Sequence, residues 1–430
     1  MKTLALRLYG KNDLRLEAFE LPPIHDDEIL ADVVSNSICM SCHKAVIQGE
    51  DHKRVPKDIA VHPTILGHEF AGRLLEVGAK YKGKFEAGSK YGIQPAVCYP
   101  GRELDAPGYS FRYIGGNATK VIIPREVLEM DCLLPYTGDG FFKASLAEPV
   151  SCIIGAYNTS YHYRQGDYVH KHGIVEGGAV AILAGAGPMG LGAVDYALHG
   201  PRQPRLLVAT DVDPSRLERA GKILTPEEAK RHGVELRYLN TGRGNPVDDL
   251  LALNGGKGYD DVFVYAPVAA LVEQAGRILG FNGCLNFFAG PPKKDFSASI
   301  NFYDVHYSGH HVVGSSGGNT DDMLEALDLM SKGAINPAAM VTHIGGLDCA
   351  AETVKNLPNI PGGKKLVYTN ISMPLTALED FEELGKNNPI FRALAEITER
   401  NKGLWSVEAE EYLLRNARPI TAVLECGRDC

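Results

Sequence analysis

The chain has 430 residues, and its 44 Lys and Arg against 53 Asp and Glu give a formal net charge of −9. At roughly 150 residues per domain this length indicates two or three domains, and 44% hydrophobic with 23% charged residues is ordinary globular composition. The mild acidity argues against nucleic acid or anionic lipid as a partner, no apolar run reaches the roughly 18–20 residues of a membrane span, and the charged start is not a secretory signal.

Residues 1–156 contain short runs of alternating or β-branched residues separated by Gly, Pro and Asp, which predicts strands joined by turns. The clearest runs are LALRLYG, ILADVVS, GRLLEVG and TKVIIP. Helical periodicity is scarce here, so we expect a partly open β-barrel.

From 157 to 317 the pattern changes to strand, turn and helix. AVAILAG, RLLVATD, DDVFVYA and GCLNFFAG are strand-like, with helical stretches such as SRLERAGKI and ALVEQAGRIL between them. This alternation predicts an α/β domain with a parallel sheet covered on both faces. Further on, TDDMLEALDLMSKGAI predicts an amphipathic helix ending at Gly333, and the last sixty residues are predicted to be helical, with helix starts at Asn388 and Ser406.

A Gly-rich turn, GAGPMG at 185–190, follows an apolar strand and precedes a helix, which is the context that a dinucleotide-binding motif needs. Gly185 permits the tight turn, Gly187 lets the backbone approach a pyrophosphate, and Gly190 lets the helix pack close to the sheet. The second strand ends in a carboxylate that would bind the ribose hydroxyls and repel a 2′-phosphate, which favours NAD over NADP. A Gly-rich turn without a ligand is the alternative. The residues predicted to bind NAD(H) are Gly185, Gly187, Pro188, Met189, Gly190, Asp211 and Arg216.

Three fragments of the strand-rich segment carry side chains of the kinds that bind zinc. SICMSCHK, ILGHEFAG and SLAEPVSC supply thiols, an imidazole and carboxylates, and a catalytic zinc site uses these types while keeping one position open. No fixed short spacing links the fragments. The residues alone therefore leave open both a zinc site and the alternative of small buried cysteines with an ordinary turn.

Taken in order, C-x-S at 39–41, GHE-x-x-G at 67–72, L-x-EP at 146–149 and the Gly-rich turn resemble the zinc-dependent medium-chain dehydrogenases, with the sorbitol and polyol branch closest. MVTHIGGLDCAAE and NIPGGKKLVYT extend the resemblance to 369, and CMSCHKAVIQGEDHKRVP with the helical tail resembles the sorbose-1-phosphate reductase subgroup. The resemblance implies a GroES-like β-barrel catalytic domain over 1–156, completed by 318–369. It also implies an inserted Rossmann NAD-binding domain with a doubly wound parallel sheet over 157–317, and a helical extension over 370–430.

The resemblance further implies that one catalytic zinc is held by Cys39, His68, Glu69 and Glu148. Glu148 would bind the metal or its water, Cys152 is a weaker rival, and Ser41 would pass the substrate proton outward. Ser41, Glu69 and Glu148 are thus the predicted catalytic residues. The implied reaction interconverts a secondary alcohol and a ketone of a polyol or ketose, here a sugar phosphate, with NAD(H). We expect a cytoplasmic homo-oligomer, dimer or tetramer. The alternatives are a zinc-free reductase of the same fold and a non-catalytic NAD-binding protein.

The sequence departs from the family pattern at three places. Cys42 stands where an aspartate usually follows the relay hydroxyl, which affects how the ligands are oriented. Lys44 replaces a relay histidine, while His43 sits one residue early. Where many relatives bind a structural zinc through four cysteines, this chain has Cys98 alone. We therefore expect no structural zinc.

The remaining histidines and cations have simpler interpretations. His162, His170 and His172 are predicted to lie in a solvated loop rather than a metal site, and His310 and His311 are given no role. The cations of the catalytic segment are either a solvated face or a site for a substrate phosphate, and the subgroup resemblance favours the phosphate: Lys53, Arg54, Lys57, Arg102 and Arg112. Five cysteines are expected to pack or lie exposed without function: Cys132, Cys284, Cys349, Cys426 and Cys430.

Overall fold

The computed structural model describes residues 1–164, 166–291 and 293–420, and the chain forms two compact units. The first unit comprises Met1–Glu148 and the chain from Val341 onward, and the second is Pro149–Met340. Cys426 and Cys430 lie outside the described residues. No helix within the described ranges is long and apolar enough to span a bilayer.

The boundaries between the two units lie at 148/149 and 340/341, whereas 156/157 and 317/318 were predicted. Helices near both predicted boundaries pack inside the second unit. In α4 (Ala147–Thr159), the Tyr157 ring stacks on Phe263 with centroids 4.5 Å apart, and its hydroxyl donates to the carbonyl of Ala193. Asn158 of the same helix donates to Asp322 of α11 (Thr320–Ser331). The helical tail is grouped with the first unit.

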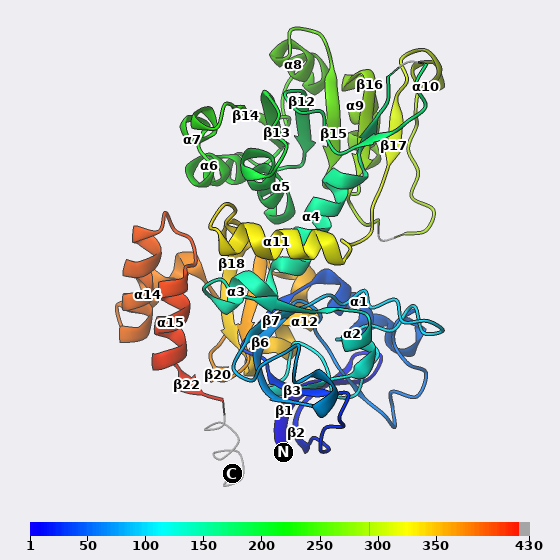
Figure 1. Ribbon diagram of the computed structural model, residues 1–430. Helices are drawn as coiled ribbons and strands as arrows, with labels where there is room; N and C mark the ends of the chain where they lie inside the picture. The colour runs from blue at the N-terminus through cyan, green and yellow to red at the C-terminus, as the bar shows by residue number, and fades with distance from the viewer. Residues whose placement is uncertain (165, 292, 421–430) are drawn as a thin grey trace. The chain divides into compact units, whose positions relative to one another are not determined.

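The first unit is built on a mixed sheet that, in the described residues, has nine strands in the order β21–β18–β19–β4–β6–β3–β8, with β7 joining β6 to β9 (Figure 1). A smaller sheet has the order β2–β1–β5, and β20 pairs with β22. The strands are β1 (Lys2–Gly10), β2 (Asp13–Glu20), β3 (Ile29–Asp32), β4 (Ser35–Ile38), β5 (Thr64–Ile65), β6 (Phe70–Val77), β7 (Lys90–Ile93), β8 (Lys120–Ile123), β9 (Leu133–Tyr136), β18 (Val341–Gly346), β19 (Lys364–Tyr368), β20 (Ile371–Ser372), β21 (Thr376–Ala377) and β22 (Arg418–Pro419).

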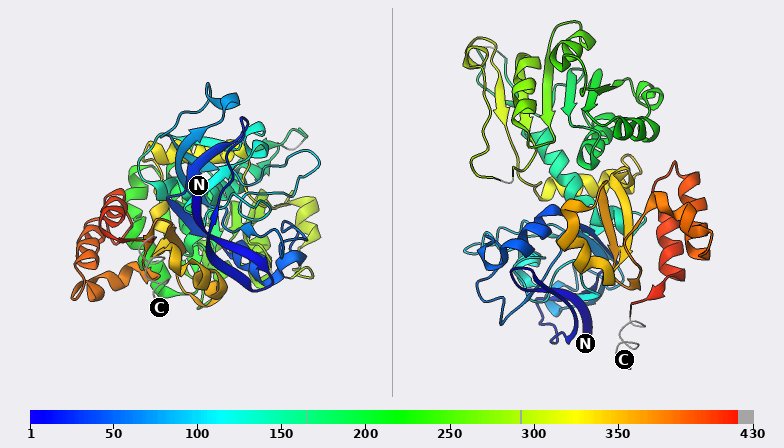
Figure 2. Two further views of the ribbon diagram at one scale, coloured as in Figure 1. Left: turned by 90° about the horizontal axis from the view of Figure 1, so that it is seen from below. Right: turned by 180° about the vertical axis from the view of Figure 1, so that it is seen from behind.

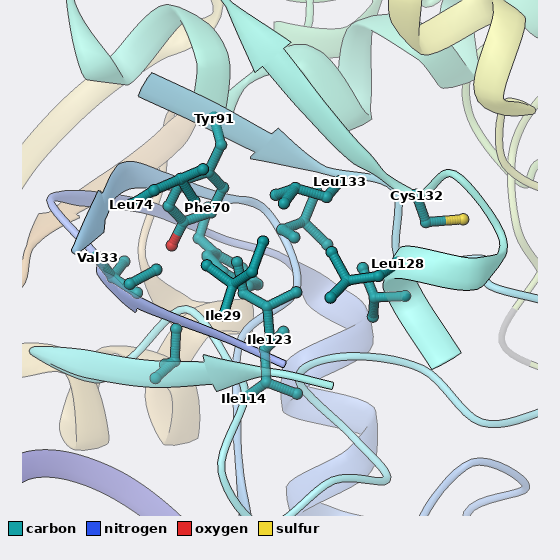
Figure 3. Close-up of a cluster of buried hydrophobic side chains, with 14 of the residues drawn as sticks. Ile29, Val33, Phe70, Leu74, Tyr91, Ile114, Ile123, Leu128, Cys132 and Leu133 are labelled. Carbon is teal, nitrogen blue, oxygen red and sulfur yellow. The ribbon is translucent and has the colours of Figure 1, made fainter. Parts of the chain in front are cut away.

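The core of this unit lies between the faces of its curved strands. Ile29, Phe70, Leu74, Tyr91 and Leu133 converge from β3, β6, β7 and β9 and are almost fully buried (Figure 3). Burying such a side chain stabilises the fold by roughly 1.5–3 kcal/mol. The four predicted strand runs all contain strands. Three of them supply apolar residues to this core, whereas Leu4, Leu6 and Leu8 of β1 pack in a second buried cluster.

Short helices complete the first unit: α1 (Met40–Gln48), α2 (Arg125–Glu129), α3 (Phe141–Ser145), α12 (Ala350–Asn356), α13 (Phe381–Gly385), α14 (Pro389–Arg400) and α15 (Val407–Asn416). The predicted helix starts are confirmed, since Asn388 and Ser406 each accept a backbone hydrogen bond as N-caps of α14 and α15. Figure 2 shows the orange and red tail helices beside the strands β18 and β19.

The second unit contains a parallel sheet that, in the described residues, has six strands in the order β14–β13–β12–β15–β16–β17 (Figure 1). This is the doubly wound order, in which β12, the first strand of the sheet along the chain, lies inside the sheet. The strands are β12 (Ala179–Leu183), β13 (Leu206–Asp211), β14 (Glu235–Asn240), β15 (Tyr259–Val264), β16 (Leu279–Phe287) and β17 (His311–Val313), and β10 (Tyr161–His162) pairs with β11 (Lys171–His172).

The helices of the second unit alternate with these strands. Besides α4 and α11 they are α5 (Pro188–His199), α6 (Pro214–Ile223), α7 (Pro226–Arg231), α8 (Pro246–Leu253), α9 (Ala269–Ile278) and α10 (Phe302–Tyr307). The four strands and three helices predicted for this region and α11 are confirmed. β14 and β17 were not predicted, because β14 is half polar and β17 has only three residues.

Candidate metal and dinucleotide sites

The fold brings Cys39, His68 and Glu69 together where the end of β4 meets the start of β6. Cys39 lies between the end of β4 and the start of α1, and His68 and Glu69 immediately precede β6. β4 runs antiparallel to β6, so the end of one strand lies beside the start of the other. The Ser37 amide donates to the Glu69 carbonyl at 2.8 Å, which fixes this junction.

The ligand atoms of these three residues form a compact cluster. One atom from each of Cys39, His68 and Glu69 lies within 4.8 Å of the others. His68 Nε2 is 4.0 Å from Glu69 Oε1, and the Ser41 hydroxyl donates to Cys39 Sγ at 3.0 Å while lying 3.4 Å from His68 Nε2. A thiol, an imidazole and a carboxylate at such separations fit a zinc ion.

The electrostatics of the cluster favour a cation at its centre. Burial, reinforced by the charges of Glu69 and Glu148, raises the pKa of the Cys39 thiol to about 11. Burial alone would lower the pKa of His68, but Cys42 and the carboxylates raise it to about 9. A bound divalent cation would lower the pKa of both Cys39 and His68, because it stabilises a thiolate and a neutral imidazole.

Lys364, the first residue of β19, occupies the same site. Its ammonium group donates to both carboxylate oxygens of Glu69, at 2.6 and 2.7 Å. Burial would lower the pKa of Lys364, but the charge of Glu69 raises it above the usual value, while Lys364 lowers the pKa of Glu69 below its usual value against the effect of burial. The buried carboxylate is therefore charged and paired.

Cys42 faces the other nitrogen of the candidate ligand His68. Its Sγ is 3.5 Å from His68 Nδ1, so the thiol occupies the position from which a carboxylate would orient the ring. His43 instead bonds the backbone carbonyl of Val354, at 3.0 Å, and does not join the cluster. The departure from the family pattern at residue 42 thus gives the His68 ring a thiol partner instead of a carboxylate, and the contact with Nδ1 is kept.

Glu148 lies in the first turn of α4 and is half-buried. Its charge contributes to the pKa shifts of both Cys39 and His68, which places it near the cluster. The compact set of donor atoms found in the described residues does not include Glu148 or Cys152. Their roles as ligand and rival stay predictions.

Two residues of this site, Lys364 and Tyr109, were not predicted from the sequence. The Tyr109 ring lies 4.9 Å from the His68 ring, centroid to centroid, and its hydroxyl forms a hydrogen bond with Ser41. Lys364 had a usable signal, because a charged residue opens an apolar strand in GGKKLVYT. Tyr109 had none, since it comes from a loop that is distant in sequence.

The Gly-rich turn has the geometry that its pattern predicts. A Cβ on Gly190 would lie 2.4 Å from the carbonyl oxygen of Gly185, so α5 packs against the turn only with glycine there. A Cβ on Gly187, the N-cap of α5, would meet nothing closer than 3.9 Å, which leaves open space in front of the helix. Pro188 opens α5 and has no N–H, so the free amides of the first turn that can bind an anion begin with Met189.

Asp211 ends β13, next to the strand that leads into the Gly-rich turn. The Gly185 amide donates to the Thr210 carbonyl at 2.6 Å, which ties the turn to this strand end. Asp211 is buried and accepts from the amide of Asp213 at 3.0 Å. Arg216 is exposed, 3.7 Å from Asp213. The roles of Asp211 and Arg216 in binding NAD(H) stay predictions.

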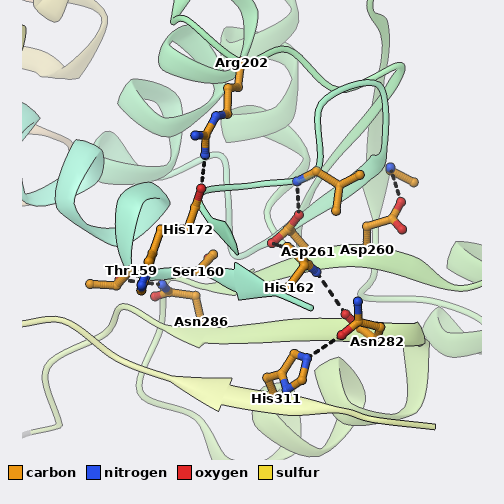
Figure 4. Close-up of polar contacts among 12 residues, drawn as sticks. Thr159, Ser160, His162, His172, Arg202, Asp260, Asp261, Asn282, Asn286 and His311 are labelled. Atoms are coloured by element: carbon orange, nitrogen blue, oxygen red, sulfur yellow. Dashed lines mark hydrogen bonds and ion pairs between the residues drawn. The ribbon is translucent and has the colours of Figure 1, made fainter. Parts of the chain in front are cut away.

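The histidines of the second unit form a structural network rather than a metal cluster within the described residues. His162 bridges the carboxylate of Asp261, at 3.0 Å, and the carbonyl of Asn282, at 2.9 Å, while His311 bonds the side chain of Asn282 at 2.7 Å (Figure 4). His170 and His172 are exposed, as a solvated loop requires, but His162 is not. The expectation of solvation was therefore wrong for His162, because Asp261 supplies a buried partner.

Comparison with known proteins assigns the family. A family model described as zinc-binding dehydrogenase matches residues 188–332. The chain is 52% identical to the L-sorbose 1-phosphate reductase of Klebsiella pneumoniae over 97% of this chain and 99% of the relative. It is 49% identical to the mannitol-1-phosphate 5-dehydrogenase of Aliivibrio fischeri over 96% of this chain and 97% of the relative. The chain belongs to the zinc-binding dehydrogenase family.

Solved structures agree with this fold. The 2R,3R-butanediol dehydrogenase of Bacillus subtilis superposes with a TM-score of 0.68 at 21% identity, covering 86% of this chain and all of that one. The expected α/β fold and the expected class, an oxidoreductase of the zinc-binding dehydrogenases, are confirmed.

Proposed function

We propose that this protein interconverts a secondary alcohol and a ketone in a phosphorylated polyol or ketose, with one zinc ion and NAD(H). The observation that carries the proposal is the buried cluster of Cys39, His68 and Glu69 with the Ser41 hydroxyl beside it. Two relatives of about half identity are named for a sugar or polyol 1-phosphate, which supports the substrate class.

Cys39, His68 and Glu69 would hold the zinc, with Glu148 as the fourth ligand or as the partner of a water. A bound zinc supplies Lewis acidity that lowers the pKa of an alcohol toward neutrality. Lys364 keeps Glu69 charged and in place, and Cys42 orients the His68 ring. Because Cys98 is exposed and no four-cysteine cluster exists in the described residues, we propose one zinc per chain.

Ser41 is the residue through which the substrate proton leaves. Its hydroxyl contacts both Cys39 and His68, and the Tyr109 hydroxyl is its hydrogen-bond partner. Ser41 would accept the alcohol proton as its own hydroxyl proton leaves to water, since the buried Tyr109 hydroxyl is already protonated. A bound NAD would supply the acceptor for the hydride from the same carbon, at C4 of its nicotinamide. The turn at Gly185–Gly190 would bind the pyrophosphate, and Asp211 the adenosine ribose.

A screen of polyols and ketoses, free and phosphorylated, with NAD and NADH tests the proposal alongside elemental analysis. We expect turnover of a phosphorylated polyol and about one zinc per chain. Cys39→Ala should lose both zinc and turnover, whereas the control Cys98→Ala, at an exposed position, should keep both. Full activity in Cys39→Ala, or a zinc-free active wild type, would establish the alternative of a zinc-free reductase.

We also propose that the enzyme works in the cytoplasm as a homo-oligomer. The edge strand β17 and the exposed aromatic residues Phe302, Tyr303 and Tyr307 of α10 give a second copy a surface to cover. Light scattering of the purified protein tests this, and a monomeric mass would reject it.

A further inference from the structure

The loop after α1 carries His52, Lys53 and Arg54 near the candidate metal site, and Lys44 comes from α1 itself. The His52 ring stacks on the Tyr109 ring, with centroids 5.5 Å apart and planes 8° from parallel. Tyr109 in turn contacts His68 and hydrogen-bonds Ser41. His52 is therefore separated from the reacting groups by one aromatic ring.

Arg54 uses the same ring as a support. Its guanidinium carbon lies 5.8 Å from the centroid of Tyr109, a cation–π contact that restricts the side chain. The backbone of Arg54 is also held, because its carbonyl accepts from the Ser110 hydroxyl and its amide donates to His52 Nδ1. Arg54 is half-buried, and its donors are thus preorganised near the site.

The positive charge here forms no ion pair within the described residues. No carboxylate of that part lies within 4.0 Å of Lys44, Lys53 or Arg54, whereas twelve other Lys and Arg side chains of this unit are paired. Burial is the largest cause that lowers the pKa of His52, and the charges of Arg54, Lys53 and Lys44 lower it further. No carboxylate is among the causes. Three uncompensated cations in one place attract an anion.

The other cations considered from the sequence do not share this position. Arg102 is held by Glu126 at 2.7 Å and by Asp105 at 2.5 Å, so its guanidinium is already used. Lys57 donates to the Glu50 carbonyl. Arg112 is exposed, and nothing in the structure ties it to the site.

We propose that Arg54, supported by Lys53 and Lys44, binds the phosphate group of the substrate. This rests on the proposed function and names the residues that select the phosphorylated form. A guanidinium offers a planar fork that matches two phosphate oxygens, and such charge-assisted bonds are stronger than neutral ones. Because Arg54 reaches the site over the Tyr109 ring, the phosphate and the reacting carbon are bound on the same domain.

The test compares wild type with Arg54→Gln, Arg54→Lys and the control Arg125→Gln, which removes an exposed arginine of the same unit. The steady-state kcat/KM is measured for a phosphorylated ketose and for its free form. Arg54→Gln should lower kcat/KM for the phosphorylated form about 10- to 100-fold and leave the free form within about twofold. Arg54→Lys should recover part of the loss, and Arg125→Gln should match wild type.

A binding measurement separates this proposal from the proposed function. Inorganic phosphate is titrated by calorimetry into zinc-loaded protein saturated with NAD, so that the dinucleotide site is occupied. Weaker phosphate binding in Arg54→Gln than in wild type supports the proposal even when no polyol is turned over, which would reject only the proposed function. Equal phosphate binding, or an Arg54→Gln enzyme that keeps the wild-type preference for the phosphorylated form, overturns it.

Discussion

Lys364 and Glu69 form an ion pair in which one ammonium group contacts both carboxylate oxygens, at 2.6 and 2.7 Å, with both side chains buried. The residues are 295 positions apart and meet because β4 pairs with both β19 and β6. The pair lets a carboxylate remain charged next to a thiol and an imidazole. It therefore prepares the site before any metal binds.

Removing the ammonium group should destabilise the protein. Lys364→Met leaves the buried Glu69 charge without its partner, and breaking such a pair costs about 3–5 kcal/mol. We expect this loss in the free energy of unfolding of the zinc-free protein, measured by urea denaturation. In the double variant Lys364→Met with Glu69→Gln, much of the loss should be recovered. Equal losses in the single and double variants would contradict the proposed coupling.

Asp211 should determine the choice of dinucleotide. Replacing it with serine removes a ribose hydrogen-bond acceptor and a charge that repels a 2′-phosphate, which together are worth about 2–4 kcal/mol. The ratio of kcat/KM for NAD to that for NADP should therefore fall about 30- to 1000-fold in Asp211→Ser. As a control, Asp213→Ser changes the N-cap of α6 and should leave this ratio unchanged. A wild type that prefers NADP would show that Asp211 does not face the ribose.

Glu410 should anchor the helical tail to the first unit. Its carboxylate accepts from the amides of Phe141 and Phe142, at 2.5 and 2.8 Å, and from the Tyr368 hydroxyl at 2.8 Å. Glu410→Gln replaces one acceptor with an amide donor that faces other donors, which should cost about 1–3 kcal/mol of unfolding free energy. Glu408→Gln breaks an exposed pair with Arg400 and should cost less than about 1 kcal/mol. Equal effects of the two variants in thermal denaturation would refute this role.

His311 should make the second unit sensitive to acid. Burial, helped by the charges of His162, His170 and His310, lowers the pKa of His311 to about 4. In the unfolded chain, His311 takes up a proton near pH 6.5. The stability that the neutral His311 ring contributes is therefore complete above that pH and is lost as the pH falls toward 4. When the pH falls from 7.5 to 5, the free energy of unfolding of His311→Gln should decrease by about 2 kcal/mol less than that of wild type. Parallel pH profiles of unfolding for the two proteins would contradict it.

Local patterns in the sequence were sufficient for many elements of this protein and for its Gly-rich turn. The period of apolar residues predicted the strands β12, β13, β15 and β16, and Asn388 and Ser406 marked helix starts, because these features depend on residues a few positions apart. The Gly-rich turn is equally local, since Gly185 and Gly190 must touch each other.

Only the tertiary structure decided which polar groups surround the candidate metal site. Lys364 reaches Glu69 through strand pairing, and Tyr109 contacts His68 from a loop. Arg54 and Arg102 differ because Arg102 has a carboxylate partner, Glu126, whereas Arg54 lies over the Tyr109 ring. Each of these contacts joins segments that are far apart in the chain. Burial then sets its strength, because a charge removed from water is controlled by the few groups that the fold places next to it.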